Sequence, residues 1–206
     1  MRLPVQRLWH PLLLSRGRGN RVEGRGPGAA FLRLATTVYG TSSDNVVEVG
    51  RNFSTGGARI HIAGAGNRVV IGDDVRFSGS IRVHGFGLRV SIGHRSDVKR
   101  THIVAWEANV AIGDDCLVAA RVHLRSNDIH PITDRATGAR LNPPRDVVVG
   151  SRVWIATEAV FLKGARVADD CVVGFRALVT RAFEEPACVI AGNPARIVRR
   201  GIAWAR

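Results

Sequence analysis

The stretch VGSRVWIATEAVFLKGARVADDCVVGFRALVTRAFE, from Val149 to Glu184, divides into six hexapeptides in one register. The first place of every hexapeptide is large and apolar: Val149, Ile155, Phe161, Val167, Val173 and Val179. The fifth place of the first five is small or β-branched: Val153, Ala159, Ala165, Cys171 and Ala177. Neither the 3.6-residue period of a helix nor the 2-residue period of a strand explains this spacing. A short strand followed by a corner does explain it, with the first place inward and a small second place where the chain turns.

The same register extends toward the N-terminus. Its expected inward residues are Ile112, Val118 and Leu124, then Ile92, Val98 and Val104, then Ile71, Phe77 and Val83, and Val49. The glycines that follow a Val or Ile at 50, 72, 93 and 113 recur 22, 21 and 20 residues apart, which indicates about three hexapeptides per turn. The sequence therefore predicts an all-β chain: an N-terminal arm or cap at 1–20, a parallel β-helix at 21–184 and a C-terminal tail at 185–206.

The composition fits one globular domain with an aliphatic core, since 45% of the 206 residues are hydrophobic and only 6% are aromatic. The formal charge of +13 has three interpretations: nucleic-acid binding, an anionic ligand or acidic polymer, or a solvated basic surface. The arginines are spread along the chain without a polybasic run, so nucleic-acid binding is not expected.

The three cysteines are an odd number without a CxxC motif, which favours reduced thiols in a cytoplasmic protein over a disulfide framework or a metal site. At the start of the chain, MRLPVQRLWHPLLL has some leucines, but Arg7, His10 and two prolines interrupt it. We therefore expect neither a signal peptide nor stable membrane insertion.

After Leu124 the register is lost until Val149, which predicts an extruded loop at 125–146. Long loops within compact domains are usually functional or disordered. This one carries Asp128, His130 and Asn142 together with two adjacent prolines, which favours function.

The loop and the stretches after it carry a specific resemblance. DIHPITD (128–134) with VVVGSRVWI (147–155), VFLKGARVADDCVVGFRALVT (160–180), AGNPARIV (191–198) and RRGIAW (199–204) resemble the signature blocks of the hexapeptide-repeat acyltransferases. The match is with the branch that O-acetylates sugars and capsular polysaccharides, and it covers about Asn45 to Arg206. The resemblance implies a left-handed parallel β-helix, an exception to right-handed crossovers.

Acyl transfer from a thioester to a hydroxyl needs a base for the hydroxyl proton and donors for the oxyanion. The resemblance makes His130 that base and places Trp154, which should point outward, beside the acetyl group. Asp128 is the third candidate; it could orient the imidazole, bind the acceptor or only shape the turn. The candidate acceptor contacts are Ser126, Asn142 and His123, although Asn142 also suits fixing the loop and His123 a plain surface position.

The implied donor is acetyl-CoA, with no metal. Small residues would leave room for the pantetheine arm and cations would bind the phosphates, with further arginines at 199 and 200. The candidate cofactor residues are Ala156, Lys163, Gly174, Ala177, Arg181, Gly192, Asn193, Pro194, Ala195 and Arg196. Three positions depart from the family's pattern. Ala156 stands where the family usually has glycine, Phe175 where it has alanine and Ala177 where it has serine. The resemblance also implies a homotrimer with acetyl-CoA between neighbouring chains.

Three alternatives stay open at this point. The acceptor could be a small glycoside or antibiotic in place of a polysaccharide. The chain could also be a non-catalytic β-helix, or a γ-carbonic anhydrase-like metalloenzyme with three histidines from adjacent coils. The last is disfavoured because His94, His102, His123 and His130 show no convincing close pair in the sequence.

Overall fold

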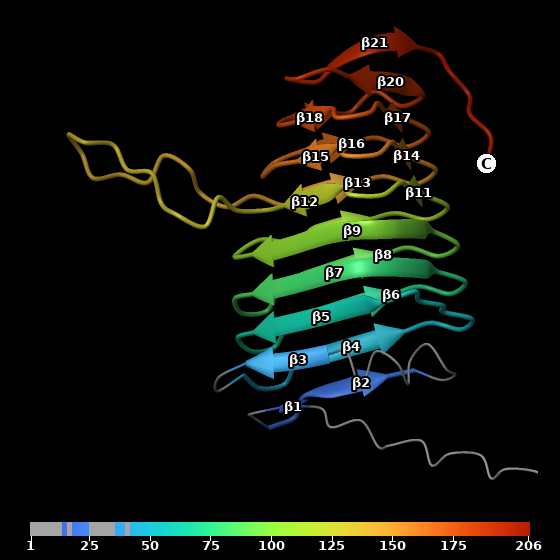
Figure 1. Cartoon of the computed structure of the whole chain (residues 1–206). Helices are drawn as coiled ribbons and strands as arrows, with labels where there is room; N and C mark the ends of the chain where they lie inside the picture. The colour runs from blue at the N-terminus through green and yellow to red at the C-terminus, as the bar shows by residue number, and fades with distance from the viewer. Residues whose placement is uncertain (1–13, 16–17, 25–35, 40–41) are drawn as a thin grey trace, which may run out of the picture.

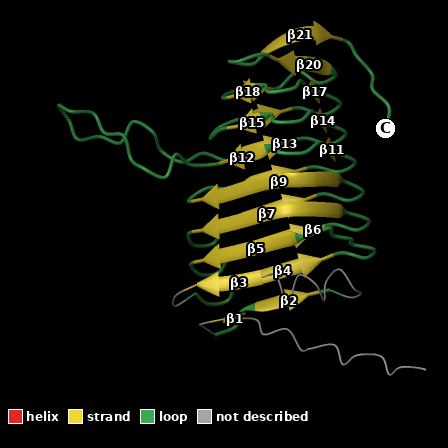
Figure 2. Ribbon diagram, viewed as in Figure 1, coloured by secondary structure: helices red, strands yellow, loops and turns green. Residues whose placement is uncertain are grey.

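The structure, a computed structural model, describes residues 14–15, 18–24, 36–39 and 42–206. Most of the expected arm at 1–20 lies outside the described residues. Within them every regular element is a strand, and the strands stack as successive coils (Figures 1 and 2). None of the described segments is a helix long and apolar enough to cross a membrane.

The strands lengthen toward the middle of the stack and shorten beyond it. In the first half they are β1 (Leu14–Ser15), β2 (Arg21–Glu23), β3 (Thr36–Tyr39), β4 (Val46–Val49), β5 (Ala58–Ala63), β6 (Arg68–Ile71), β7 (Arg76–His84), β8 (Arg89–Ile92), β9 (Asp97–Trp106), β10 (Val110–Ile112), β11 (Leu117–Val118) and β12 (His123–Arg125). In the second half they are β13 (Val147–Val149), β14 (Trp154–Ile155), β15 (Val160–Phe161), β16 (Arg166–Val167), β17 (Val172–Val173), β18 (Leu178–Val179), β19 (Ala182–Phe183), β20 (Cys188–Ala191) and β21 (Arg196–Arg200).

From β10 onward each coil contributes one strand to each of three faces. The first face is β11, β14, β17 and β20, the second is β12, β15 and β18, and the third is β10, β13, β16 and β19. Neighbouring coils pair in parallel, and among the described strands only β21 runs antiparallel, against β20. The predicted left-handed parallel β-helix is therefore confirmed. β20 still pairs in parallel with β17, so the coils continue past residue 184.

The core is made of ladders of like residues. Leu124, Phe161 and Val179 occupy equivalent positions on successive rungs of the second face, and all three are fully buried. The expected inward places from Val149 to Val179 are all buried. The small second place is explained by coil stacking, since a Cβ on Gly113 would lie 2.6 Å from the carbonyl of Gly150 in the next coil.

One inward position was predicted wrongly. Val104 is half-buried and points outward, whereas its neighbours Ile103 and Ala105 are fully buried. The register of β9 against β7 shifts between Phe77 and Gly79, which gives β9 one extra residue, so the partner of the inward Val83 is Ala105 and not Val104. Leu124 accordingly pairs with Ile103, and the outward row of this face also moves by one residue.

The loop between β12 and β13 leaves the body at the edge between the second and third faces and projects far from it (Figure 1). In a three-sided prism that edge lies opposite the first face. The loop and β14 of the first face therefore lie on opposite sides of the prism.

Candidate active site

His130 lies near the base of the projecting loop with its side chain exposed to solvent. Its backbone N–H donates to the Asp128 carbonyl at 2.9 Å. The preceding residue, Ile129, has φ of 73°, which is a strained conformation for a β-branched side chain. Such strain is kept where the surrounding structure imposes it, and it often accompanies functional positions. The chain is thus held in a specific path immediately before the candidate base.

Two buried asparagines hold this path: Asn127, whose Oδ1 accepts from the N–H of Ile129 at 2.7 Å, and Asn142. Its Nδ2 donates to the carbonyl of His130 and to the carboxylate of Asp128, each at 2.9 Å, and its Oδ1 accepts from the N–H of Ile132 at 2.6 Å. It is 5% exposed, so water competes little for these bonds. These bonds suit the loop-fixing role expected for Asn142, and its role as an acceptor contact stays a prediction.

Asp128 ties the loop to the wall. Its carboxylate pairs with Lys163, at the same edge one coil further on, and accepts from Asn142. The Lys163 hydrogen bond, and then that of Asn142, hold the pKa of Asp128 below its usual range. Among its described contacts none is to the His130 imidazole. The geometry therefore favours an anchoring role for Asp128, and it engages Lys163, which was expected to bind cofactor phosphate.

The two other candidate acceptor residues differ in access. Ser126 is fully buried, and its hydroxyl bonds backbone groups of β9 and the turn after it, so this geometry makes it a corner residue. His123 is exposed on the second face beside His102, with ring centroids 4.9 Å apart. Partial burial lowers the pKa of His123, and His102 and Arg125 lower it further.

The His102–His123 contact corrects the expectation that the histidines form no close pair. It arises because the two residues are register partners on β9 and β12. The described residues nevertheless contain no group of three or more His, Cys, Asp or Glu side chains arranged to hold a metal ion.

Trp154 points outward, as expected, with 40% of its surface exposed. It lies on the first face, opposite the edge that carries the loop, so one chain does not bring Trp154 and His130 together. Its neighbour is Trp204 of the C-terminal segment, at 6.2 Å between ring centroids. Trp204 is itself fixed by a 2.8 Å bond from Nε1 to the carbonyl of Arg152.

The candidate cofactor residues fall into separate groups. Ala156, Gly174 and Ala177 lie at the edge between the first and second faces, whereas Lys163 and Arg181 lie at the loop's edge. Ala177 is fully buried, and its backbone N–H and C=O bond to Gly174 and Val160, so in one chain it offers no accessible surface to a ligand. The remaining candidates are Arg196, the first residue of β21, and the turn before it, which bonds to Leu178 of β18 and consists of Gly192, Asn193, Pro194 and Ala195.

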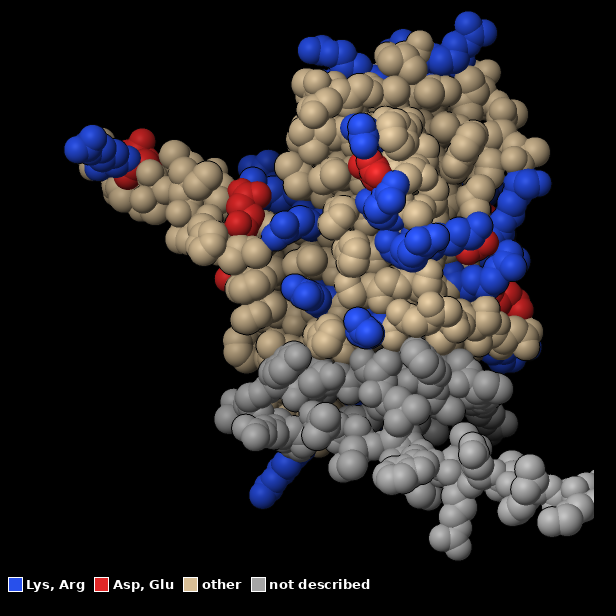
Figure 3. Space-filling view, viewed as in Figure 1, with Lys and Arg blue, Asp and Glu red and all other residues tan. Residues whose placement is uncertain are grey.

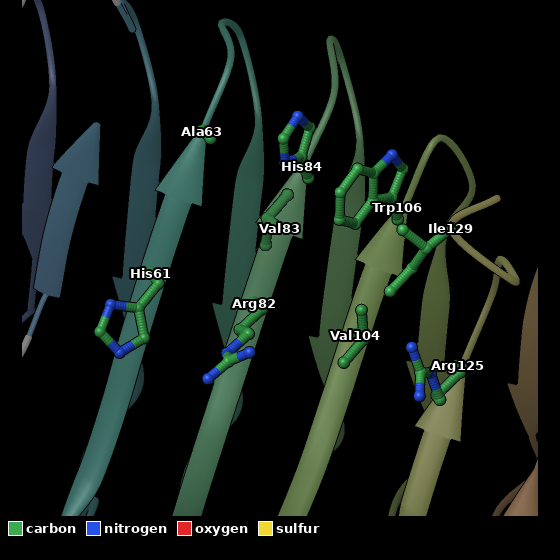
Figure 4. A pocket seen from close by; sticks show the side chains of 9 residues that line it. All are labelled: His61, Ala63, Arg82, Val83, His84, Val104, Trp106, Arg125 and Ile129. Carbon is green, nitrogen blue, oxygen red and sulfur yellow. The ribbon is translucent and has the colours of Figure 1, made fainter. Parts of the chain in front are cut away.

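Two clefts flank the base of the loop. The one toward the C-terminus has a volume of about 260 Å³ and is lined by Leu141, Pro143, Arg145, Leu162, Lys163 and Thr180. The one toward the N-terminus has a volume of about 360 Å³ and is lined by His61, Ala63, Arg82, Val83, His84, Val104, Trp106, Arg125 and Ile129 (Figure 4). His130 itself lines neither cleft, although the preceding residue, Ile129, lines the one toward the N-terminus.

Sequence reasoning missed the N-terminal cleft. Most of its lining residues occupy alternate, outward-facing positions of β5, β7, β9 and β12. The hexapeptide register predicts such outward positions once its phase is correct. Placing Val104 inward hid that row, because the correct phase aligns Arg82, Val104 and Arg125 as outward neighbours.

Comparisons with known proteins agree with this architecture. No protein-family model matches the chain. The chain is 32% identical to a polysialic acid O-acetyltransferase of Neisseria meningitidis over 176 residues, which cover 85% of this chain and 82% of that protein. It is 36% identical over 121 residues to a polysialic acid O-acetyltransferase of Escherichia coli O1:K1, where the match spans 58% of this chain but 39% of the relative. The crystal structure of the polySia-specific acetyltransferase NeuO superposes with a TM-score of 0.81 at 28% identity, over 93% of this chain and 87% of that one.

Proposed function

The chain belongs to the hexapeptide-repeat acyltransferases, in the branch of sugar and capsular polysaccharide O-acetyltransferases, and we propose that it transfers an acetyl group from acetyl-CoA to a hydroxyl of a polysaccharide. The observation that carries the proposal is His130, exposed at the base of a loop that a buried Asn142 holds in one path. The names of the relatives support an O-linked carbohydrate acceptor.

His130 acts as the general base in this proposal. Neutral imidazole accepts the proton of the acceptor hydroxyl, and the hydroxyl oxygen attacks the thioester carbonyl directly. Protonated His130 then returns the proton as the tetrahedral intermediate collapses and the thiol of CoA leaves. Direct attack without an acyl-enzyme is supported by the state of Ser126 and the cysteines in the described part of the chain. Ser126 is buried and hydrogen-bonded to backbone, and all three cysteines are buried with raised pKa values.

A homotrimer would complete the site. One chain holds His130 at the edge opposite the face that carries Trp154, and it divides the candidate cofactor residues between two edges. Three prisms packed side by side would set the loop edge of one chain against the Trp154 face or the Ala156 edge of the next. Light scattering should therefore give three times the chain mass of 22.3 kDa, and a monomer that remains fully active would contradict this arrangement.

A cytoplasmic location is part of the proposal. Acetyl-CoA is a cytoplasmic metabolite, and the three cysteines are free thiols.

The experiment that tests the function is thiol release from acetyl-CoA with a panel of glycans. We expect release that depends on a carbohydrate with free hydroxyls, together with a mass gain of one acetyl group on that carbohydrate. An acetyl group found only on amino sugars would change the reaction to N-transfer. No acceptor-dependent release with any hydroxyl compound would refute the enzymatic assignment.

A further inference from the structure

The cleft on the N-terminal side of the loop has a regular construction. His61, Arg82, Val104 and Arg125 are register partners on four successive rungs, so they form one outward row across β5, β7, β9 and β12. Ala63, His84 and Trp106 form a second row two residues further along. Adjacent rungs are about 4.8 Å apart, so the first row extends over roughly 14 Å. That length accommodates more than one sugar unit.

The ionisable side chains that line this cleft are basic. None of its nine lining residues is acidic, and two are arginines. Within the described part of the chain, neither Arg82 nor Arg125 forms an ion pair or a side-chain hydrogen bond. The acids near the loop base already have partners, since Glu107 pairs with Arg140 and Asp128 with Lys163. Lys and Arg also outnumber Asp and Glu on the face of the body shown in Figure 3.

Burial and the arginines of this region lower the pKa of His61, and the cations in the cleft repel one another. Burial lowers the pKa of His61, and the positive charges of Arg82 and Arg59 lower it further. Two cations turned toward one cleft without a counter-charge repel each other, and a bound anion relieves that repulsion. Guanidinium groups match the planar geometry of a carboxylate and donate two parallel hydrogen bonds to it.

The end of the cleft nearest the loop is aromatic. The rings of His84 and Trp106 stack at 4.0 Å with an interplanar angle of 5°, and Trp106 stands beside Ile129 (Figure 4). Aromatic rings offer a rigid apolar surface on which one face of a sugar ring can rest. Ile129 immediately precedes His130, so this cleft ends next to the candidate base.

We propose that the cleft bounded by His61, Arg82, Trp106 and Arg125 is the acceptor subsite for an acidic glycan. Arg82 and Arg125 bind the carboxylate of a sugar unit next to the one that is acetylated, and the His84–Trp106 stack supports a sugar ring. This inference rests on the proposed acetyl transfer for its biological meaning. It assigns the charge selectivity of the acceptor to residues outside the C-terminal cleft that Lys163 lines.

The test compares Arg82→Gln with Arg89→Gln, which removes the same charge from an exposed position on β8 outside the cleft. The probes are an oligosaccharide of sialic acid and the same oligosaccharide with its carboxylates reduced to alcohols. Binding is measured by titration calorimetry without acetyl-CoA, so the result does not depend on turnover. We expect Arg82→Gln to weaken binding of the acidic probe by about tenfold and to leave the weak binding of the neutral probe unchanged. Arg89→Gln should resemble the wild type with both probes.

Acetyl transfer assays on the same proteins separate the two hypotheses. For Arg82→Gln we expect a higher KM for the acidic acceptor, an unchanged KM for acetyl-CoA and an unchanged kcat. Binding that depends on Arg82 without any acetyl transfer would contradict the proposed function and leave the subsite in place. Acetyl transfer to an acidic glycan with equal binding and KM in the two variants would overturn the subsite, as would failure of the acidic probe to bind at all.

Discussion

Replacing Asn142 with alanine removes the hydrogen bonds that hold the loop around His130. The change deletes a charge-assisted bond to Asp128, a bond to the His130 carbonyl and a bond from the Ile132 N–H. Such bonds contribute about 1.5–3 kcal/mol when one partner is charged and about 1 kcal/mol when both are neutral. The three bonds share one side chain and are not additive. We therefore take about 2–3 kcal/mol as the free energy by which Asn142→Ala destabilises the ordered conformation of the loop.

The assay is acceptor-dependent thiol release together with a thermal melt. We expect kcat/KM to fall by about 30-fold to 160-fold, since 1.36 kcal/mol corresponds to a factor of ten. The melting temperature should change by less than about 3 °C, because the loop lies outside the ladders of the core. The matched control is Thr137→Ala at the loop tip, which removes a 2.9 Å bond to Asp134 in the same loop and should keep full activity. Equal activity of the two variants would refute the claim that Asn142 positions the base.

Three further predictions concern the wall and the loop anchor. Phe161→Ala should lower the free energy of unfolding by about 3–5 kcal/mol in urea titrations, because this fully buried ring fills the core, and a loss below 1 kcal/mol would contradict the packing. The three buried cysteines should stay unreactive toward a thiol reagent at pH 8 until the chain unfolds, since burial raises the pKa of Cys116 to about 11; rapid labelling of the native protein would oppose this. The depressed pKa of Asp128 means that its pair with Lys163 stabilises the loop above the ordinary aspartate range and is lost as pH falls through the lowered value. Lys163→Gln should raise the Asp128 pKa toward 3.8 in an NMR titration, and an unchanged value would exclude the pair in solution.

The sequence predicted the wall well because each coil repeats the same physical constraint. A large residue at the first place and a small one at the corner are required on every rung, so places such as Ile155 and Val173 were predicted correctly to be buried. The loop was also predicted from the loss of that register after Leu124.

Side-chain neighbours across coils were harder to predict, because a single register shift moves a whole row. The shift opposite Gly79 turned Val104 outward and concealed the cleft with Arg82 and Arg125. The contact of Trp154 with Trp204 also lay beyond the pattern, since a C-terminal segment without a repeat makes it. The bond between Asp128 and Lys163 joins residues separated by the whole loop, which spacing alone does not reveal.

If the loop places His130 as the base, replacing this imidazole should abolish most of the acetyl transfer without disturbing the donor site. Wild type and His130→Ala are compared for acetyl transfer to a polysaccharide hydroxyl at saturating acetyl-CoA, with calorimetry of CoA binding on both. His130→Ala should lose at least about a hundredfold in kcat, the scale of general-base catalysis, while CoA binding and the melting temperature are retained. A variant that transfers acetyl groups at the wild-type rate would exclude His130 as the base.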